Sequence, residues 1–160
     1  MSPSPETWLP LDPAERRVLG VLIEKQTTSK SADAYPMTLN GIVVGSNQKS
    51  NRDPVTEYDE DDVEETLTRL QKRGLVTKVT GSRVDRYRHL LYEAWKATKV
   101  EMAILAELLL RGPQTEGDLR GRASRMDDIK DVDELRGLLT ALAGRNLVVY
   151  LTEPGRRGTV

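Results

Sequence analysis

The chain has 160 residues, a formal net charge of -1 and a pI of about 5.9, so its overall charge does not mark a nucleic-acid-binding protein. It contains no cysteine, which excludes disulfide bonds, thiol nucleophiles and cysteine-ligated metal sites and fits a reducing cytoplasm. With no Phe, two Trp and five Tyr, it also has few aromatic side chains on which single-stranded nucleic acid could stack.

The N-terminal residues show no targeting signal. Residues 1–6 lack the basic start and the apolar stretch of a signal peptide, and the apolar runs of the chain are too short to span a bilayer. We therefore expect a cytoplasmic protein without a membrane partner, in which residues 1–10 form a flexible tail.

Three helices are predicted in the first half of the chain. Asp12 supplies an N-cap oxygen, Pro13 fits the first helical position, and Glu15 can close a capping box. A second helix should follow Thr38, and a third should begin near Asp59. The first helix has an apolar stripe at helical spacing, formed by Val18, Leu19, Leu22 and Ile23.

A β-hairpin is predicted to follow the third helix. Gly74 stands where a left-handed C-cap residue belongs, and residues 75–79 are rich in β-forming side chains. Residues 80–85 can turn the chain back, so that residues 86–90 pair as the returning strand. Three helices followed by such a hairpin constitute a winged helix.

The same order of signals recurs over residues 98–151. The N-cap positions of the three helices repeat at Thr98, Thr115 and Asp131, and the left-handed residue after the third helix repeats at Asn146. A β-rich segment, 147–151, follows the last of them, as 75–79 follows Gly74. Because each match falls at an equivalent helix boundary and the order is kept, the pattern indicates a tandem repeat.

The predicted fold is therefore mainly α with small β-hairpins, an α+β protein of two tandem winged helix-turn-helix domains. We expect the first domain over residues 11–92, a connector over 93–98 and the second domain over 99–160. The second wing is expected to be incomplete, because the chain ends at Val160 before a full returning strand.

Several segments together resemble a known bacterial family. The resemblance covers nearly the whole chain and is carried by residues 11–18, 23–26, 47–55, 81–84 with 87–89, and 109–115. These segments are similar to the YceH family, also named DUF480 or UPF0502. The resemblance implies a tandem winged-helix protein of the bacterial cytoplasm whose biochemical function is not established, and whose members generally continue into a further strand and a C-terminal extension.

The first candidate site is a polar run after the second predicted helix. Amide and guanidinium groups are the donors and acceptors that base edges and phosphates require. Alternatively, these side chains cap the helix and hold the following long loop through bonds to its backbone. The candidate residues are Asn47, Gln48, Lys49, Asn51 and Arg52.

The second candidate site is the basic hairpin. Strand alternation places Arg86 and Arg88 on one face, with Tyr87 and His89 on the other. With Arg83 in the turn and Lys78 on the preceding strand, these cations suit contact with phosphates or the minor groove. The alternative is an ordinary solvated strand face, or cations that pair with acidic residues of the third helix.

Acidic residues crowd the start of the third helix. Carboxylates at a helix N-terminus cap it and complement its dipole. They nevertheless argue against the usual insertion of this helix into the major groove. They lack a histidine or a fixed loop geometry, so we predict no metal site. The residues are Glu57, Asp59, Glu60, Asp61, Asp62, Glu64 and Glu65.

Catalytic signals are not found. His89 is the only histidine, and its place on a strand among tyrosine and leucines favours a packed, hydrogen-bonded role. The sequence has no Gly-rich phosphate loop, nucleophile elbow or metal-ligand spacing. We therefore expect a non-enzymatic protein without a cofactor.

Two functions are consistent with these residues. The leading hypothesis is a regulator that binds duplex DNA through the basic hairpin and the 47–52 run, an inference that rests partly on analogy between folds. The alternative is a scaffold whose winged helices form a homodimer or dock another protein. For that alternative, Trp8 and Trp95 are the candidate interaction residues, unless each packs against its own domain.

Overall fold

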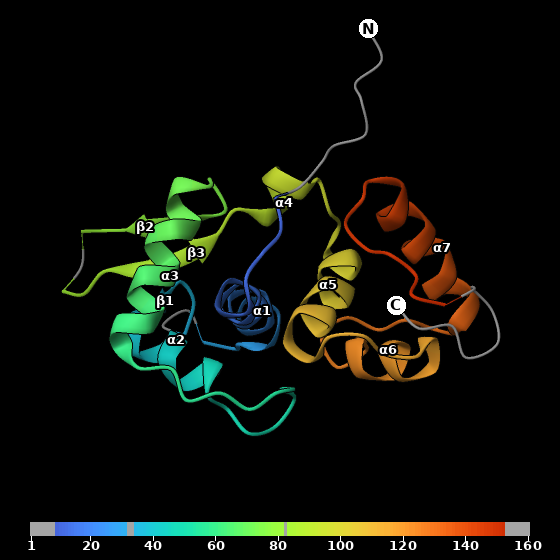
Figure 1. Ribbon diagram of the computed structural model, residues 1–160, viewed down its shortest axis with the longest axis horizontal. Coiled ribbons are helices and arrows are strands. Elements are labelled where there is room, and N and C mark those ends of the chain that lie inside the picture. The colour runs from blue at the N-terminus through green and yellow to red at the C-terminus, as the bar shows by residue number, and fades with distance from the viewer. Residues whose placement is uncertain (1–8, 32–33, 82, 153–160) are drawn as a thin grey trace, which may run out of the picture.

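The computed structural model describes residues 9–31, 34–81 and 83–152, and within these ranges the protein is a mixed α/β structure (Figure 1). Seven helices and a small three-stranded antiparallel sheet are formed there. In chain order they are α1 (Pro13–Thr28), β1 (Met37–Thr38), α2 (Leu39–Ser46), α3 (Glu60–Lys72), β2 (Val76–Val79), β3 (Arg86–His89), α4 (Leu91–Trp95), α5 (Lys99–Arg111), α6 (Glu116–Ala123) and α7 (Val132–Gly144).

The predicted capping boxes of α1 and α5 are confirmed. The Glu15 backbone N–H donates to Asp12 Oδ1 at 2.8 Å, and the Asp12 N–H donates to Glu15 Oε1 at 3.0 Å. Thr98 and Glu101 make the same reciprocal pair at the start of α5. Each box satisfies two backbone donors that the helix itself cannot.

The other predicted helix boundaries are also confirmed. Four side chains cap α2, α3, α6 and α7, namely Thr38, Asp59, Thr115 and Asp131. Gly74 and Asn146 have positive φ angles of 74° and 59°, as expected for left-handed residues after a helix. In both halves of the chain, helices therefore begin at the same kinds of N-cap side chain, and the third helix is followed by a left-handed residue.

The sheet has the order β1-β3-β2, with β3 in the centre. The predicted hairpin is present, and its register pairs Lys78 with Tyr87 and Thr77 with Arg88. Strand β1 was not predicted, because its two residues, Met37 and Thr38, are too few to show a periodicity.

The predicted strand over residues 147–151 is wrong, since these residues form no strand in the described part of the chain. A β-rich composition alone does not make a strand, because a strand requires hydrogen bonds to a paired neighbour. The rest of the predicted second wing, residues 153–160, lies outside the described residues. Helix α4 lies at the predicted junction between the first domain and the connector, and it spans residue 92.

Helix α1 lies at the centre of the molecule (Figure 1). All eight of its residues from Arg17 to Glu24 are buried, so it has no solvent-facing side along this stretch. It packs against α5 on one side and against α2 and α3 on the other. The apolar core is one continuous cluster that includes Leu22 from the first half and Leu110 from the second.

The close approach of α1 and α5 depends on Gly20. A Cβ atom at this position would lie 2.8 Å from Leu110 Cγ and Cδ2 and 3.2 Å from Leu109 Cβ. Leu110 is fully buried, so it has little room to move away.

None of the described helices is both long enough and apolar enough to cross a membrane.

We expect Gly20→Ala to lower the free energy of unfolding by about 1 to 3 kcal/mol, because it overpacks this crossing. Urea denaturation followed by circular dichroism measures the change. Gly137→Ala is the matched control, since a Cβ there would meet nothing within 4 Å and should stabilise α7 by roughly 0.5 to 1 kcal/mol. Equal effects of the two changes would contradict the proposed close packing.

Candidate nucleic-acid surface

The polar run after α2 mainly holds its own loop. Asn47 caps α2, its Nδ2 donates to the Tyr58 carbonyl at 2.7 Å, and its Oδ1 accepts from the Tyr58 N–H at 2.8 Å. One amide thus joins the two ends of the loop. Its Oδ1 also accepts from the Thr56 hydroxyl at 3.1 Å, so none of its bonds is directed outward.

Gln48 and Asn51 have comparable structural roles. Gln48 Oε1 accepts from Lys25 Nζ at 3.0 Å, and its Nε2 donates to the Ser50 carbonyl at 3.0 Å. Asn51 has a φ of 56°, and its Oδ1 accepts from Arg111 at 2.9 Å. Lys49, by contrast, is exposed and remains the solvent-facing cation of the run.

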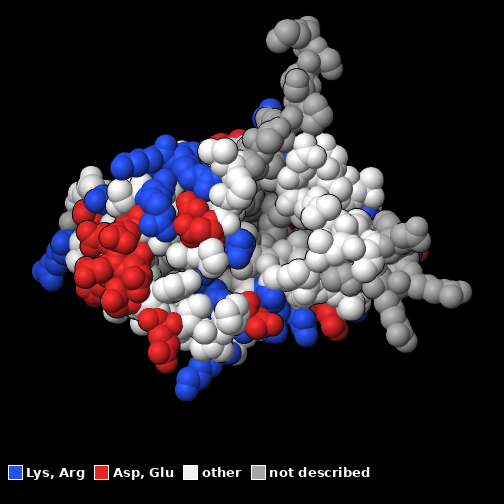
Figure 2. Space-filling view, in the orientation of Figure 1, with Lys and Arg blue, Asp and Glu red and all other residues white. Residues whose placement is uncertain are grey.

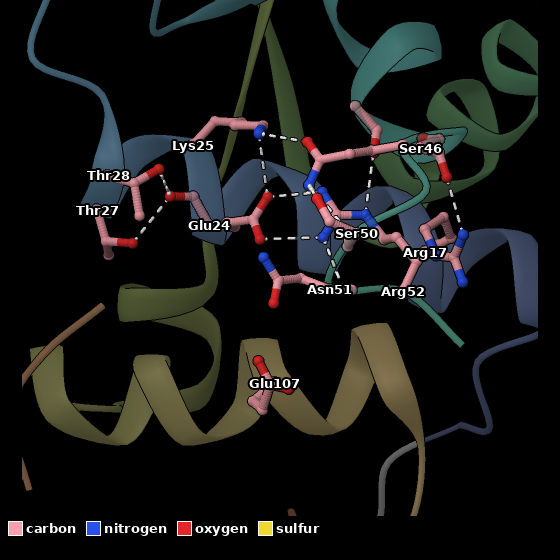
Figure 3. Close-up of polar contacts among 12 residues, drawn as sticks. Arg17, Glu24, Lys25, Thr27, Thr28, Ser46, Ser50, Asn51, Arg52 and Glu107 are labelled. Atoms are coloured by element: carbon pink, nitrogen blue, oxygen red, sulfur yellow. Dashed lines mark hydrogen bonds and ion pairs between the residues drawn. The ribbon is translucent and has the colours of Figure 1, made fainter. Parts of the chain in front are cut away.

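Arg52 lies in the interior and binds Glu24 of α1 through two nitrogens (Figure 3). Its NH2 donates to Glu24 Oε1 at 2.6 Å and its NH1 to Oε2 at 3.0 Å, while its Nε donates to the Gly45 carbonyl. The Arg52 side chain has no exposed surface. It therefore cannot reach a phosphate or a base edge in this arrangement, and the loop-holding alternative accounts for its position.

The charge of Glu24 is balanced by side chains from both halves. Lys25 Nζ lies 3.2 Å from its Oε1, and Arg125, from the segment between α6 and α7, lies 2.7 Å from its Oε2. Burial alone would raise the pKa of Glu24, but hydrogen bonds from Arg52 and the charges of Arg52, Lys25 and Arg125 lower it to about 2.

Arg125 extends this network to a second buried carboxylate, Glu107 of α5. Its NH2 donates to Glu107 Oε2 at 3.0 Å, and Arg111 Nε lies 2.6 Å from Glu107 Oε1. The second contact is an ion pair whose geometry is not that of a hydrogen bond. Sequence analysis missed Glu24 and Glu107, although an acidic residue within an otherwise apolar helical stretch is a signal for a buried ion pair.

The hairpin shows the predicted alternation. Tyr87 and His89 of β3 are buried, whereas Arg88 is exposed and Arg86 is half-buried, so the two arginines share the outward face. Arg86 NH1 donates to the Pro36 carbonyl at 3.0 Å. Arg83, in the turn before β3, is exposed. We call this side of the sheet the outer sheet face. Its residues are Thr38, Thr77, Val79, Arg86 and Arg88.

Lys78 is separated from these arginines. It pairs with Tyr87 across the hairpin and therefore lies on the inward face, with its Nζ 5.9 Å from the centre of the Tyr87 ring. Its Nζ is also 3.9 Å from Asp85 Oδ2. The four predicted cations of the hairpin thus do not form a single patch.

His89 is held as a neutral side chain. Its Nδ1 accepts from the Leu91 N–H at 3.1 Å, so its Nε2 carries the proton and donates to Gln26 Oε1 at 2.6 Å. Burial lowers the pKa of His89 to about 4, against a smaller opposite effect of Glu93. Each of its nitrogens is occupied by a structural hydrogen bond.

The acidic residues at the start of α3 are all exposed, and Figure 2 shows a negative area on the side of the molecule where α3 lies. Asp59 and Asp62 form a reciprocal capping box, which gives two of the seven a structural role. Within the described ranges, no cluster of histidine and acidic side chains is arranged to hold a metal ion. The start of α3 therefore presents a negative surface to solvent.

Of the two predicted interaction residues, Trp95 is only 6% exposed and belongs to the core. Trp95 therefore packs inside its own chain, which is the alternative to a role as an interaction residue. Trp8 lies outside the described residues.

Comparison with known proteins gives the family. Residues 11–156 match the family described as "Protein of unknown function, DUF480". The chain belongs to the DUF480 family. The resemblance noted in the sequence is thereby confirmed.

Bacterial relatives of this family match most of the chain. A UPF0502 protein of Rhodopirellula baltica is 46% identical over 151 residues, which cover 94% of this chain and 63% of that protein. A UPF0502 protein of Citrifermentans bemidjiense is 46% identical over 151 residues, with 92% and 69% covered. One of Pseudomonas aeruginosa is 44% identical over 142 residues, with 89% and 63% covered. The chain thus spans about two thirds of the length of these relatives.

We expect Arg52→Leu to lower the free energy of unfolding by about 3 to 5 kcal/mol, because it removes one partner of a buried ion pair. Urea denaturation measures this loss. Lys49→Ala, three residues earlier and exposed, should change the stability by no more than about 0.5 kcal/mol. A near-neutral Arg52→Leu would show that Glu24 does not depend on Arg52.

Stability should fall as the pH is lowered through the titration of His89. Because its folded pKa of about 4 lies below the ordinary value of 6.5, the stabilising contribution is complete above pH 6.5 and is lost toward pH 4. The loss can reach at most about 3 kcal/mol. Urea denaturation across this range should show a smaller pH dependence for His89→Gln, and an identical dependence would refute the assignment.

Proposed function

We propose that this protein is a non-enzymatic cytoplasmic binding protein built from two tandem winged helix-turn-helix units. The first unit would comprise α1, α2, α3 and the β2–β3 hairpin, and the second α5, α6 and α7. Equivalent caps at Asp12 and Thr98, at Thr38 and Thr115, and at Asp59 and Asp131 support this assignment.

We further propose that the outer sheet face contacts the backbone of duplex DNA. The observation that carries this proposal is the charge of that face, because Arg86 and Arg88 are the ionisable members of its five residues and both are cations. Arg83, in the adjoining turn, is a third cation and is exposed, as Arg88 is. Arginine is well suited to phosphate contacts because its planar group can donate two parallel hydrogen bonds.

The proposed contact is with phosphates and not through insertion of α3 into the major groove. Seven exposed carboxylates at the start of α3 would be brought against the DNA polyanion by such insertion. Because Asn47, Asn51 and Arg52 hold the structure together, Lys49 is the one residue of the polar run that we retain in the proposed surface.

Binding to a labelled duplex, followed by fluorescence anisotropy from low to near-physiological salt, tests the proposal. Arg83→Ala with Arg88→Ala should weaken binding at low salt and reduce the slope of log K against log salt by roughly 2, about 0.9 per lost phosphate contact. Arg86 is left intact because it also bonds the Pro36 carbonyl.

Lys99→Ala with Lys130→Ala is the matched control. Both lysines are exposed, and the pair changes the net charge by the same amount away from the hairpin. An equal loss of binding in both double variants would indicate a general charge effect and would contradict a surface on the outer sheet face.

A protein scaffold is the second candidate, and the uncharged face of the second half favours it. Figure 2 shows few charged side chains over this half in that view. The outer side of α7 carries small exposed residues, among them Thr140 and Ala141. Absence of duplex binding at low salt, together with a molecular mass that rises with concentration in sedimentation experiments, would favour a homodimeric scaffold over the DNA-binding protein.

A further inference from the structure

An apolar groove of about 930 Å³ runs between the two halves of the molecule. Its apolar lining includes Leu75 and Trp95 from the first half and Leu105, Leu108, Leu109 and Leu147 from the second. The volume falls in the range of cavities that bind small organic molecules. Leu9 and Val149, which also line the groove, are 73% and 67% exposed, so the apolar surface continues to the rim.

The charged residues of this lining all have the same sign. They are Arg16, Lys72 and Arg73, and no carboxylate lines the groove among the described residues. Arg73 is partly neutralised, because its NH1 lies 3.1 Å from Glu15 Oε2 and its NH2 donates to the Leu9 carbonyl. Arg16 and Lys72 are exposed, and the Arg16 NH1 donates to the Leu11 carbonyl at 2.9 Å.

The groove therefore combines an apolar lining with positive charge that has only partial compensation. Arg16 stands in the first turns of α1 and Lys72 at the end of α3, so two different elements bring cations to the same lining. An uncharged ligand would leave this charge unused, and a cationic one would be repelled. An anion attached to an apolar chain complements both parts.

We propose that this groove binds an elongated small molecule with an apolar tail and a terminal carboxylate, of the fatty-acid type. The tail covers the accessible apolar surface of the lining, which belongs to Leu108, Leu109 and Leu147 and to Leu9 and Val149 at the rim, and displaces water from it. The carboxylate pairs with Lys72 and Arg16 at the basic side. The groove lining shares no residue with the outer sheet face, so this inference stands independently of DNA binding.

Titration with dodecanoate below its micelle concentration tests the proposal. In a Trp8→Phe background the remaining tryptophan, Trp95, lines the groove, so its fluorescence should change with ligand occupancy. We expect affinity to rise roughly three- to fourfold per methylene from octanoate through decanoate to dodecanoate, as burial of apolar chain requires. Dodecyltrimethylammonium, with the same tail and opposite charge, should bind at least tenfold more weakly than dodecanoate.

Charge-reversal variants locate the carboxylate. Arg16→Glu with Lys72→Glu should weaken dodecanoate binding at least tenfold, whereas Lys130→Glu with Lys99→Glu, exposed and outside the lining, should alter it less than twofold. Circular dichroism and urea denaturation check that each variant is folded. All four positions are exposed, so the substitutions leave the core unchanged.

Three results would overturn the proposal. The first is the absence of dodecanoate binding, and the second is binding that both charge-reversal pairs leave unchanged. The third is a groove filled by a second copy of the chain, seen as a concentration-dependent dimer in sedimentation that Leu108→Asp abolishes. A failure of DNA binding would affect none of these readouts.

Discussion

Glu24 keeps a negative charge where its side chain is only 2% exposed, and its partners come from widely separated parts of the chain. Lys25 is its neighbour on α1, Arg52 belongs to the loop after α2, and Arg125 belongs to the segment after α6. A buried carboxylate is costly unless cations and hydrogen bonds compensate it. Satisfying this one group therefore places two loops from opposite halves of the molecule.

This constraint decides which residues are left to meet a ligand. The loop after α2 cannot lift toward a nucleic acid without separating Arg52 from Glu24 (Figure 3) and without breaking the hydrogen bond between Asn51 and Arg111. Ligand binding at the surface is therefore left to residues outside the hydrogen bonds and ion pairs that surround Glu24. The exposed arginines of the hairpin and the residues that line the groove between the halves lie outside this network.

Much of the local structure could be predicted from the sequence, because the signals are short. The capping box of Asp12 and Glu15 involves residues three apart, and the alternation of Tyr87 and Arg88 needs only neighbours. Arg52 could not be placed in this way, since its partner Glu24 lies 28 residues earlier. The 147–151 segment has the composition of a strand but forms none in the described structure, because strand formation depends on a paired neighbour, which composition does not reveal.

The central position of α1 has a consequence for the newly made chain. Helix α1 is buried along its whole middle stretch, yet α5, which covers one of its sides, begins about 70 residues later in the sequence. At translation rates of about 5 to 20 residues per second, the apolar side of α1 waits roughly 4 to 14 seconds for its cover. During this interval the nascent first half exposes to solvent an apolar surface that the finished protein buries, and such transiently exposed surfaces promote aggregation.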